Sequence, residues 1–181
     1  MIRYGKIILR AIETEDLPAL KNWRNDKELR KHFREYRELN NENQLRWFEK
    51  KVVQDNSTIM FAICDKDNRL IGACGLCYIN WIQRSADLSL YVGLDGLYID
   101  EEGFAEDATK ALMKYAFHEL GLVKIWTEIY EYDIKKKSLL SKLGFSVDGL
   151  LRKQHFYDGT WWNSILLSII DEDYNHKYHK S

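Results

Sequence analysis

The chain has 181 residues, of which 45% are hydrophobic and 30% are charged, and its formal net charge at pH 7 is −1. This length and balance predict one globular domain with a full core and exclude an intrinsically disordered chain. Because the net charge is close to zero, no overall field would recruit nucleic acid or an acidic membrane, and we expect neither as a partner.

The first third of the chain predicts a strand followed by two helices. The strand is expected over residues 6–12, KIILRAI. Leu17, Leu20 and Trp23 then recur at the spacing of one helix face, and a second helix is expected over 41–53. The chain therefore opens with a β-α-α order.

Three strands are expected next. The segments IMFAICD, LIGACGLCYIN and ADLSLYVG are rich in strand-forming residues, and the turn Lys66-Asp67-Asn68 joins the first two. Because short connections favour antiparallel neighbours, these segments predict a meander.

The second half alternates helices and strands. An amphipathic helix is expected over about 104–120, a strand over 123–130 and a short helix near 135–142. A closing hairpin, HFYDGTWWNSILLSII, turns at Asp158-Gly159, and we expect the tail over 171–181 to be frayed. The order predicts a mixed fold, antiparallel at first and with a βαβ-like unit later.

Cysteine usage and the lack of long apolar runs both indicate the cytoplasm. Cys74 and Cys77 form a C-x-x-C, but an apolar, strand-like segment places their thiols on opposite faces of a sheet. We expect these two and Cys64 to be reduced core thiols, with neither a redox pair nor a metal site. No signal peptide or membrane span is expected, because no apolar run is long enough.

The most informative stretch is the strand, turn and helix within residues 86–120. The strand ADLSLYVG leads to the acidic turn DEEGFAED, with its single glycine, and then to the helix ATKALMKYAFHEL. The exposed N–H groups of such a turn and helix start point at an anion, which is a common way of holding a phosphorylated cofactor. No G-x-G-x-x-G opens the first helix, so a dinucleotide-binding fold is excluded.

The order of these segments resembles the GNAT superfamily of acetyl-CoA-dependent N-acetyltransferases. LRAIETEDLPALKNWRND is similar to the opening of the branch that includes ribosomal-protein N-terminal acetyltransferases, and SKLGFSVDGLLRKQHFYDGTWWNSILLSII is similar to its closing segment. The resemblance implies an α+β (mixed α/β) GNAT fold, in which helices flank a central, mostly antiparallel twisted sheet. It implies a single acetyltransferase domain over residues 1–170 and a C-terminal tail over 171–181.

The resemblance also implies acetyl-CoA as co-substrate and two groups of residues that bind it. A splayed strand would offer the backbone of Leu90, Tyr91 and Val92 to the pantetheine arm. The turn and the helix start would hold the pyrophosphate through Gly103, Phe104, Ala105 and Glu106. Asp133 stands where the family often has an asparagine that hydrogen-bonds the pantetheine.

The chain departs from the family pattern in its acids and at the proton donor. Asp100 replaces the glutamine or arginine that opens the pyrophosphate turn, and Glu101 and Glu102 add charges that oppose a bound phosphate. At Leu140 the family often has a tyrosine that protonates the departing thiolate, and leucine cannot donate a proton. The candidate substitutes are Tyr91, Tyr130 and Tyr132.

The resemblance assigns a base and an acceptor site. Glu128, in WTEIY, matches a glutamate that acts as general base in part of the family, and a salt-bridged or edge-exposed glutamate is the alternative. Arg30, Arg34 and Tyr36 lie in a basic, aromatic segment where the family shapes its acceptor site, and His155 lies in the closing hairpin nearby. Such a segment suits an acidic acceptor, with a solvated face as the alternative.

We therefore predict an N-acetyltransferase that moves the acetyl group of acetyl-CoA to a primary amine of a small molecule such as an amino sugar. One alternative is a protein N-terminus as the acceptor. Another is a GNAT-fold binding or regulatory protein without catalysis. We expect no metal site, and the sequence leaves open whether the chain forms a homodimer.

Overall fold

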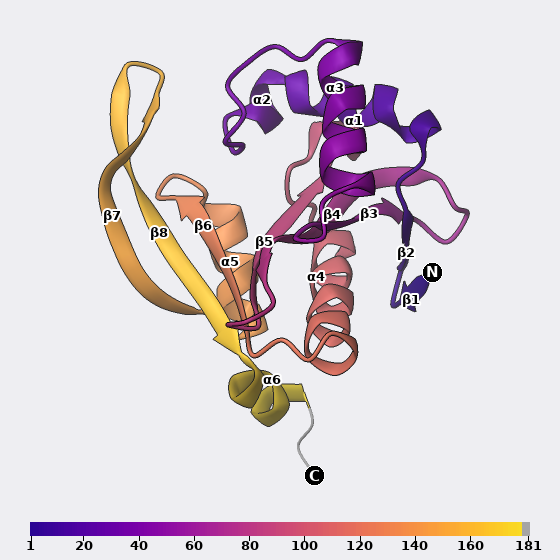
Figure 1. The fold of residues 1–181 in the computed structure, drawn as a ribbon. Coiled ribbons are helices and arrows are strands. Elements are labelled where there is room, and N and C mark those ends of the chain that lie inside the picture. The colour runs from indigo at the N-terminus through magenta and orange to yellow at the C-terminus, as the bar shows by residue number, and fades with distance from the viewer. Residues whose placement is uncertain (179–181) are drawn as a thin grey trace.

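Within residues 1–178, which the structure describes, the computed structural model folds as an eight-stranded sheet with helices on both sides (Figure 1). The strands are β1 (Ile2–Tyr4), β2 (Ile7–Ala11), β3 (Ile59–Cys64), β4 (Leu70–Asn80), β5 (Ser85–Val92), β6 (Lys124–Tyr130), β7 (Ser146–Tyr157) and β8 (Thr160–Ile170). The α-helices are α1 (Leu17–Asn25), α2 (Lys27–Arg30), α3 (Asn41–Trp47), α4 (Phe104–Lys114), α5 (Ile134–Leu143) and α6 (Asp171–Tyr178). The shorter or wider helical turns are η1 (Thr14–Asp16), η2 (Phe48–Val53), η3 (Leu94–Gly96) and η4 (Tyr115–Glu119).

The sheet topology confirms the expected mixed α/β architecture. Its strand order is β1-β2-β3-β4-β5-β6-β8-β7, and every neighbouring pair is antiparallel except β5 and β6. The expected meander is formed by β3, β4 and β5, and the expected βαβ-like unit is formed by β5, α4 and β6. The Asp158-Gly159 turn joins β7 to β8 in a long hairpin that extends away from the rest of the sheet (Figure 1).

Three elements differ from the sequence-based expectation. β1 and α2 were not expected, and α2 forms because Asp26 accepts hydrogen bonds from the N–H groups of Glu28 and Leu29 at the helix start. The expectation of a frayed tail is wrong for Asp171–Tyr178, which form α6 and bury Tyr174. Residues 179–181 of that tail lie outside the described residues.

Small side chains let α4 lie close to the sheet. Its buried face includes Ala105, Ala108 and Ala111, and the helix contacts β1, β2, β4 and β5. A short side chain at each contact brings the helix backbone near the strands. The start of α4 is therefore fixed beside the end of β5, where the site described below begins.

The sheet opens into a fork between β5 and β6. The two strands pair only from Ser85 with Lys124 to Asp87 with Trp126, whereas β6 goes on pairing with β8 as far as Tyr130. At the base of the fork the Thr127 hydroxyl donates a 3.2 Å hydrogen bond to the carbonyl oxygen of Leu88. Beyond that bond β5 and β6 no longer pair with each other, and the N–H of Val92 near the end of β5 donates to the carbonyl oxygen of Tyr98 instead. No described helix combines the length and the apolar character needed to cross a membrane.

Candidate active site

A cleft of about 370 Å³ opens at the fork. Its walls come from β5 through Leu88, Ser89 and Leu90, from β6 through Thr127, Glu128 and Tyr130, and from residues 32–35 after α2. The two strands are rigid parts of the sheet, whereas the third wall is a loop. The cleft therefore combines two strands of the sheet with one wall formed by a loop.

Two carboxylates in the cleft converge on one guanidinium group. Arg34 Nη1 lies 2.9 Å from Asp87 Oδ2, and Arg34 Nη2 lies 3.5 Å from Glu128 Oε2. The side chains of Asp87 and Glu128 are 7% and 17% exposed, whereas that of Arg34 is 46% exposed. Asp87 and Glu128 therefore form a mostly buried binding site for a cation, and Arg34 of the same chain occupies it.

Burial and neighbouring charges shift the pKa values of this cluster in opposite directions. Burial raises the pKa of Asp87, although the charge and hydrogen bond of Arg34 oppose that shift. Burial alone would lower the pKa of Arg34, but the charge and hydrogen bond of Asp87 and the charge of Glu128 outweigh it, so that pKa is raised. A neighbouring cation therefore favours the ionised form of Asp87, against the effect of burial.

A second polar cluster, made of Tyr98, Lys136 and Asp133, lies at the same fork. Lys136 Nζ donates a 3.1 Å hydrogen bond to the Tyr98 hydroxyl, and both residues are buried and line the cleft. Burial lowers the pKa of Lys136, with the charges of Asp133 and Asp87 opposing the shift. Burial and then Asp133 raise the pKa of Tyr98 well above its usual value. This cluster places exchangeable protons inside the cleft.

Asp133 orders this second cluster. Its carboxylate accepts a 3.1 Å hydrogen bond from the N–H of Lys136 and so caps the start of α5. Asp133 Oδ2 also lies 3.4 Å from His32 Nδ1, and the His32 ring stacks on Tyr98 with the ring centroids 4.1 Å apart. The Asp133 side chain is thus already engaged with the protein. Leu140, one turn further along α5, is completely buried and does not line the cleft.

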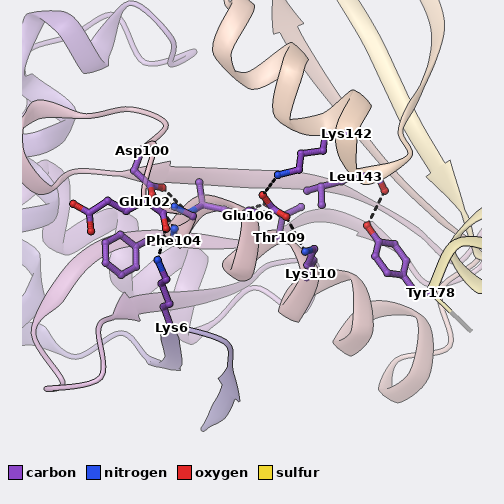
Figure 2. A network of polar contacts seen from close by, with 12 residues as sticks. Lys6, Asp100, Glu102, Phe104, Glu106, Thr109, Lys110, Lys142, Leu143 and Tyr178 are labelled. Carbon is purple, nitrogen blue, oxygen red and sulfur yellow. Dashed lines mark hydrogen bonds and ion pairs between the residues drawn. The ribbon is translucent and has the colours of Figure 1, made fainter.

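The acidic turn before α4 is closed by its own first acid. Asp100 accepts hydrogen bonds from the N–H groups of Gly103, Phe104 and Ala105, at 2.6, 2.8 and 2.7 Å (Figure 2). Glu101 and Glu102 are exposed to solvent. Of the three acids at this turn, Asp100 alone faces the amide groups.

The other residues expected at the cofactor are divided between the cleft and the core. Leu90 lines the cleft, whereas Tyr91 is buried against Trp23 and does not line it. The N–H of Val92 donates to the carbonyl oxygen of Tyr98, at 3.0 Å. The Glu106 carboxylate accepts from Lys110 at 2.8 Å and from Lys142 at 2.6 Å, and so ties α4 to α5 (Figure 2).

The basic segment after α1 carries little free positive charge. Arg30, Lys31 and Arg37 form ion pairs with Glu38, Glu28 and Glu35, respectively. Arg34 is held by the two acids of the cleft. Tyr36 is 85% exposed and lies outside the cleft lining. Of the expected acceptor residues in this segment, the structure therefore brings only Arg34 to the cleft.

His155 lies on the β7–β8 hairpin next to the cleft wall. Its ring stacks on that of Tyr130 with the centroids 3.6 Å apart, and its Nε2 is buried without a hydrogen-bond partner among the described residues. Burial lowers the pKa of His155, opposed by the charge of Glu128. The imidazole is therefore biased towards its neutral form.

Sequence reasoning missed Asp87, Tyr98 and Lys136. Asp87 is the single acid in an otherwise apolar strand, ADLSLYV, which is a usable signal for a functional carboxylate. Lys136 shares the buried face of α5 with Leu140 and Leu143, at helical spacing. A charged residue on an apolar helix face could have marked it. No comparable signal was available for Tyr98, because its loop has no regular period.

Within the described residues, neither a metal-binding cluster nor a reactive thiol is present. No group of three or more metal-binding side chains occurs there. Cys64, Cys74 and Cys77 are free thiols, and burial raises the pKa of all three, which makes them poor nucleophiles. The expectation of core thiols is confirmed for Cys64 and Cys74, whereas Cys77 is only partly buried and lines the cleft.

The known proteins to which this chain is similar are acetyltransferases. A model of the acetyltransferase (GNAT) domain family matches residues 6–146. The spermidine N(1)-acetyltransferase of Vibrio cholerae is 26% identical over 170 residues, which are 94% of this chain and 96% of that protein. The spermidine N(1)-acetyltransferase of Escherichia coli K12 is 29% identical over 124 residues, which are 68% of this chain and 64% of that protein.

A solved structure extends the similarity to three dimensions. The crystal structure of spermidine N-acetyltransferase from Vibrio cholerae, in complex with CoA and spermine, matches with a TM-score of 0.86 and 25% sequence identity. The match covers 93% of this chain and 98% of that one. The shared fold therefore spans nearly the whole of both chains.

Proposed function

Since this chain belongs to the acetyltransferase (GNAT) family and is therefore an acetyl-CoA-dependent N-acetyltransferase, we propose that it acetylates a primary amine of a polyamine such as spermidine. One observation carries the proposal: Asp87 and Glu128 converge on the guanidinium of Arg34. A polyamine presents the same chemistry, which is a cation able to donate several hydrogen bonds. If the loop that carries Arg34 moves away, the two carboxylates remain as a seat for an ammonium group.

The expected amino-sugar acceptor is not supported. It rested on free positive charge in the segment of Arg30 to Arg37, and those arginines are neutralised by neighbouring acids. The relatives described above act on spermidine by name, so they favour neither a protein N-terminus nor a non-catalytic role. They also do not confirm the ribosomal-protein branch.

The chemistry of two regions fits acetyl-CoA. The amides of Gly103, Phe104 and Ala105 already converge on a carboxylate, so they are arranged for an anion such as a phosphate. The open edge of β5 from Leu88 to Leu90 offers backbone groups to an extended amide chain such as pantetheine. Acetyl-CoA supplies the acetyl group as a thioester, which an amine can attack without a covalent enzyme intermediate.

Glu128 is the base in this proposal. A polyamine amine is protonated at neutral pH, and only the neutral amine attacks a carbonyl group. The carboxylate of Glu128 lines the cleft and lies within 3.5 Å of the cation that now occupies it. It would accept the amine proton directly or through one water. Asp87, deeper in the fork, would hold positive charge in place of Arg34.

Tyr98 and Lys136 supply the return proton. The departing thiolate needs a proton, and Leu140 cannot give one. The hydrogen-bonded hydroxyl and ammonium groups of Tyr98 and Lys136 are buried in the cleft wall. Their shared proton network would take over the role that a tyrosine has at the Leu140 position in much of the family.

An amine panel tests the acceptor. Thiol release from acetyl-CoA would be measured with spermidine, spermine, putrescine, glucosamine 6-phosphate and a short peptide with a free N-terminus, at equal concentrations. We expect kcat/KM to be largest for spermidine or spermine. A larger value for the sugar phosphate or the peptide would overturn the polyamine assignment. Binding of acetyl-CoA without turnover of any amine would favour a regulatory protein.

A further inference from the structure

The amide groups that open α4 are fully occupied by a side chain of the same turn. Asp100 Oδ2 accepts from the N–H groups of Gly103 and Phe104, and Oδ1 accepts from that of Ala105. A carboxylate that receives three backbone N–H donors is bound as an external anion would be. The turn is therefore an anion site with an internal occupant (Figure 2).

The backbone of the turn leaves this site open to solvent. Gly103 has φ +98°, a left-handed conformation that glycine adopts without strain, and it turns the following amides to one side. A Cβ atom built on Gly103 would meet nothing within 4 Å. A phosphate could therefore approach the same three donors once the carboxylate of Asp100 has rotated away.

Two lysines lie beside the exposed acids at the rim of the turn. Lys6 Nζ donates a 2.7 Å hydrogen bond to the carbonyl oxygen of Glu102, and Lys135 Nζ lies 3.3 Å from Glu101 Oε1. The side chain of Glu101 is 87% exposed, so water screens its charge. Two lysines thus stand at the rim of the turn while the amides stand at its centre.

We propose that Asp100 is an internal competitor of acetyl-CoA, whose carboxylate occupies the diphosphate site and must leave when the co-substrate binds. The three N–H···O bonds to Asp100 are then exchanged for bonds to phosphate oxygens, and Asp100 turns to solvent. Because only the open form of the turn binds the diphosphate, the observed affinity is reduced by the fraction of molecules in that form. The proposal concerns the co-substrate alone and does not depend on which amine is acetylated.

If Asp100 competes with the co-substrate, Asp100→Ala should lower the thermal stability of the protein and raise its affinity for CoA. Without ligand, the variant should melt several degrees below wild type, because three N–H groups lose their acceptor. In calorimetry with CoA, it should bind about 5- to 10-fold more tightly, because the competing carboxylate is gone. Asp100→Asn, which removes the charge and keeps one acceptor oxygen, should lie between wild type and Asp100→Ala.

Two controls separate competition from general electrostatics. Glu101→Gln removes a charge from the same turn without removing a hydrogen bond to the amides, and it should change CoA affinity by less than about 2-fold. Pantetheine, which has no phosphate, should bind wild type and Asp100→Ala equally. If Asp100→Ala weakens CoA binding, or matches Glu101→Gln, or tightens pantetheine as much as CoA, the proposal is wrong.

A structure of the wild-type chain with CoA completes the test and needs no variant to fold. We expect the carboxylate of Asp100 to lie beyond hydrogen-bond distance of the amides of Gly103, Phe104 and Ala105, with phosphate oxygens in its place. A carboxylate still bonded to these amides in the complex would overturn the proposal. Failure of wild type and all variants to bind CoA would also overturn it, whatever the amine panel shows.

Discussion

The fork and the acidic turn each hold a charged group of the chain itself, but they hold it with different parts of the molecule. At the fork, side chains of Asp87 and Glu128 bind a guanidinium. At the turn, backbone amides bind the carboxylate of Asp100. Any residue except proline supplies an amide, so the turn tolerates changes of sequence that keep its shape. The fork depends on the identity of each side chain, so substitutions there should have the larger effects.

The largest expected effect is the loss of Glu128, the proposed base. Glu128→Gln keeps the size of the side chain and removes its ability to accept a proton, and we expect kcat to fall about 100-fold or more. CoA affinity should stay within about 2-fold, because the proposed diphosphate site lies at the turn. Initial rates and calorimetry measure the two quantities.

Glu38→Gln is the matched control for that change. Glu38 pairs with Arg30, is 71% exposed and does not line the cleft. The kcat of the Glu38→Gln variant should therefore equal that of wild type. Equal losses in both variants would mean that Glu128 contributes charge to the region rather than proton transfer.

The second effect concerns the buried pair in the cleft wall. Tyr98→Phe leaves the Lys136 ammonium buried without its acceptor and should cost about 1–3 kcal/mol of unfolding free energy. Lys136→Met replaces the charge with an apolar chain of similar length but leaves the buried Asp133 without that cation, so it should cost more, about 3–5 kcal/mol. Urea unfolding checks both.

Activity then separates a structural pair from a proton donor. At a temperature where Lys136→Met is still folded, it should lose at least about tenfold in kcat, and the loss should be greatest above neutral pH, where solvent protons are scarce. A folded variant with unchanged turnover at every pH would remove Lys136 from the mechanism and leave it a packing role.

A smaller effect is expected for Arg34, the internal cation of the fork. Arg34→Ala removes an exposed partner that competes with the acceptor, so the KM for spermidine should fall roughly two- to fivefold. Arg30→Ala is the control, because Arg30 pairs with Glu38 outside the cleft. A rise in KM would instead mean that Arg34 positions the acceptor.

The smallest effect is expected in the loop that carries Arg34. The hydrogen bond from Arg37 lowers the pKa of Glu35 to about 2, with burial opposing the shift. A lowered folded-state pKa adds stability above the usual value of 4.5, and this stability is lost as the pH falls from 4.5 towards 2. Glu35→Gln should therefore cost about 0.5 kcal/mol at pH 7 and nothing near pH 2. A difference from wild type that persists at pH 2 would contradict this pairing.

The fold was predictable because its signals are local and repeated. Alternating strands, the Asp158-Gly159 turn and the helix faces of α1, α3, α4 and α5 follow from residue spacing alone. The helix α6 was missed because its residues are mostly polar and its order depends on Tyr174, which is buried against distant parts of the chain. Tertiary packing decided the structure of that segment.

The site was predictable only in part, for the same reason. Gly103 and Ala105 sit at a fixed spacing that marks the turn, and Glu128 stands out on an apolar strand. The direction in which Asp100 points could not be inferred, because a carboxylate next to amides can face them or face water. Tyr98 and Lys136 are 38 residues apart and meet only through the fold.

The short helix α6 has a consequence for the candidate cleft. The Tyr178 hydroxyl donates a 3.0 Å hydrogen bond to the carbonyl oxygen of Leu143, at the end of α5 (Figure 2). The other end of α5 carries Asp133 and Lys136 at the fork. A change that displaces α6 would therefore remove a hydrogen bond from the end of α5, the helix whose Lys136 lines the candidate cleft.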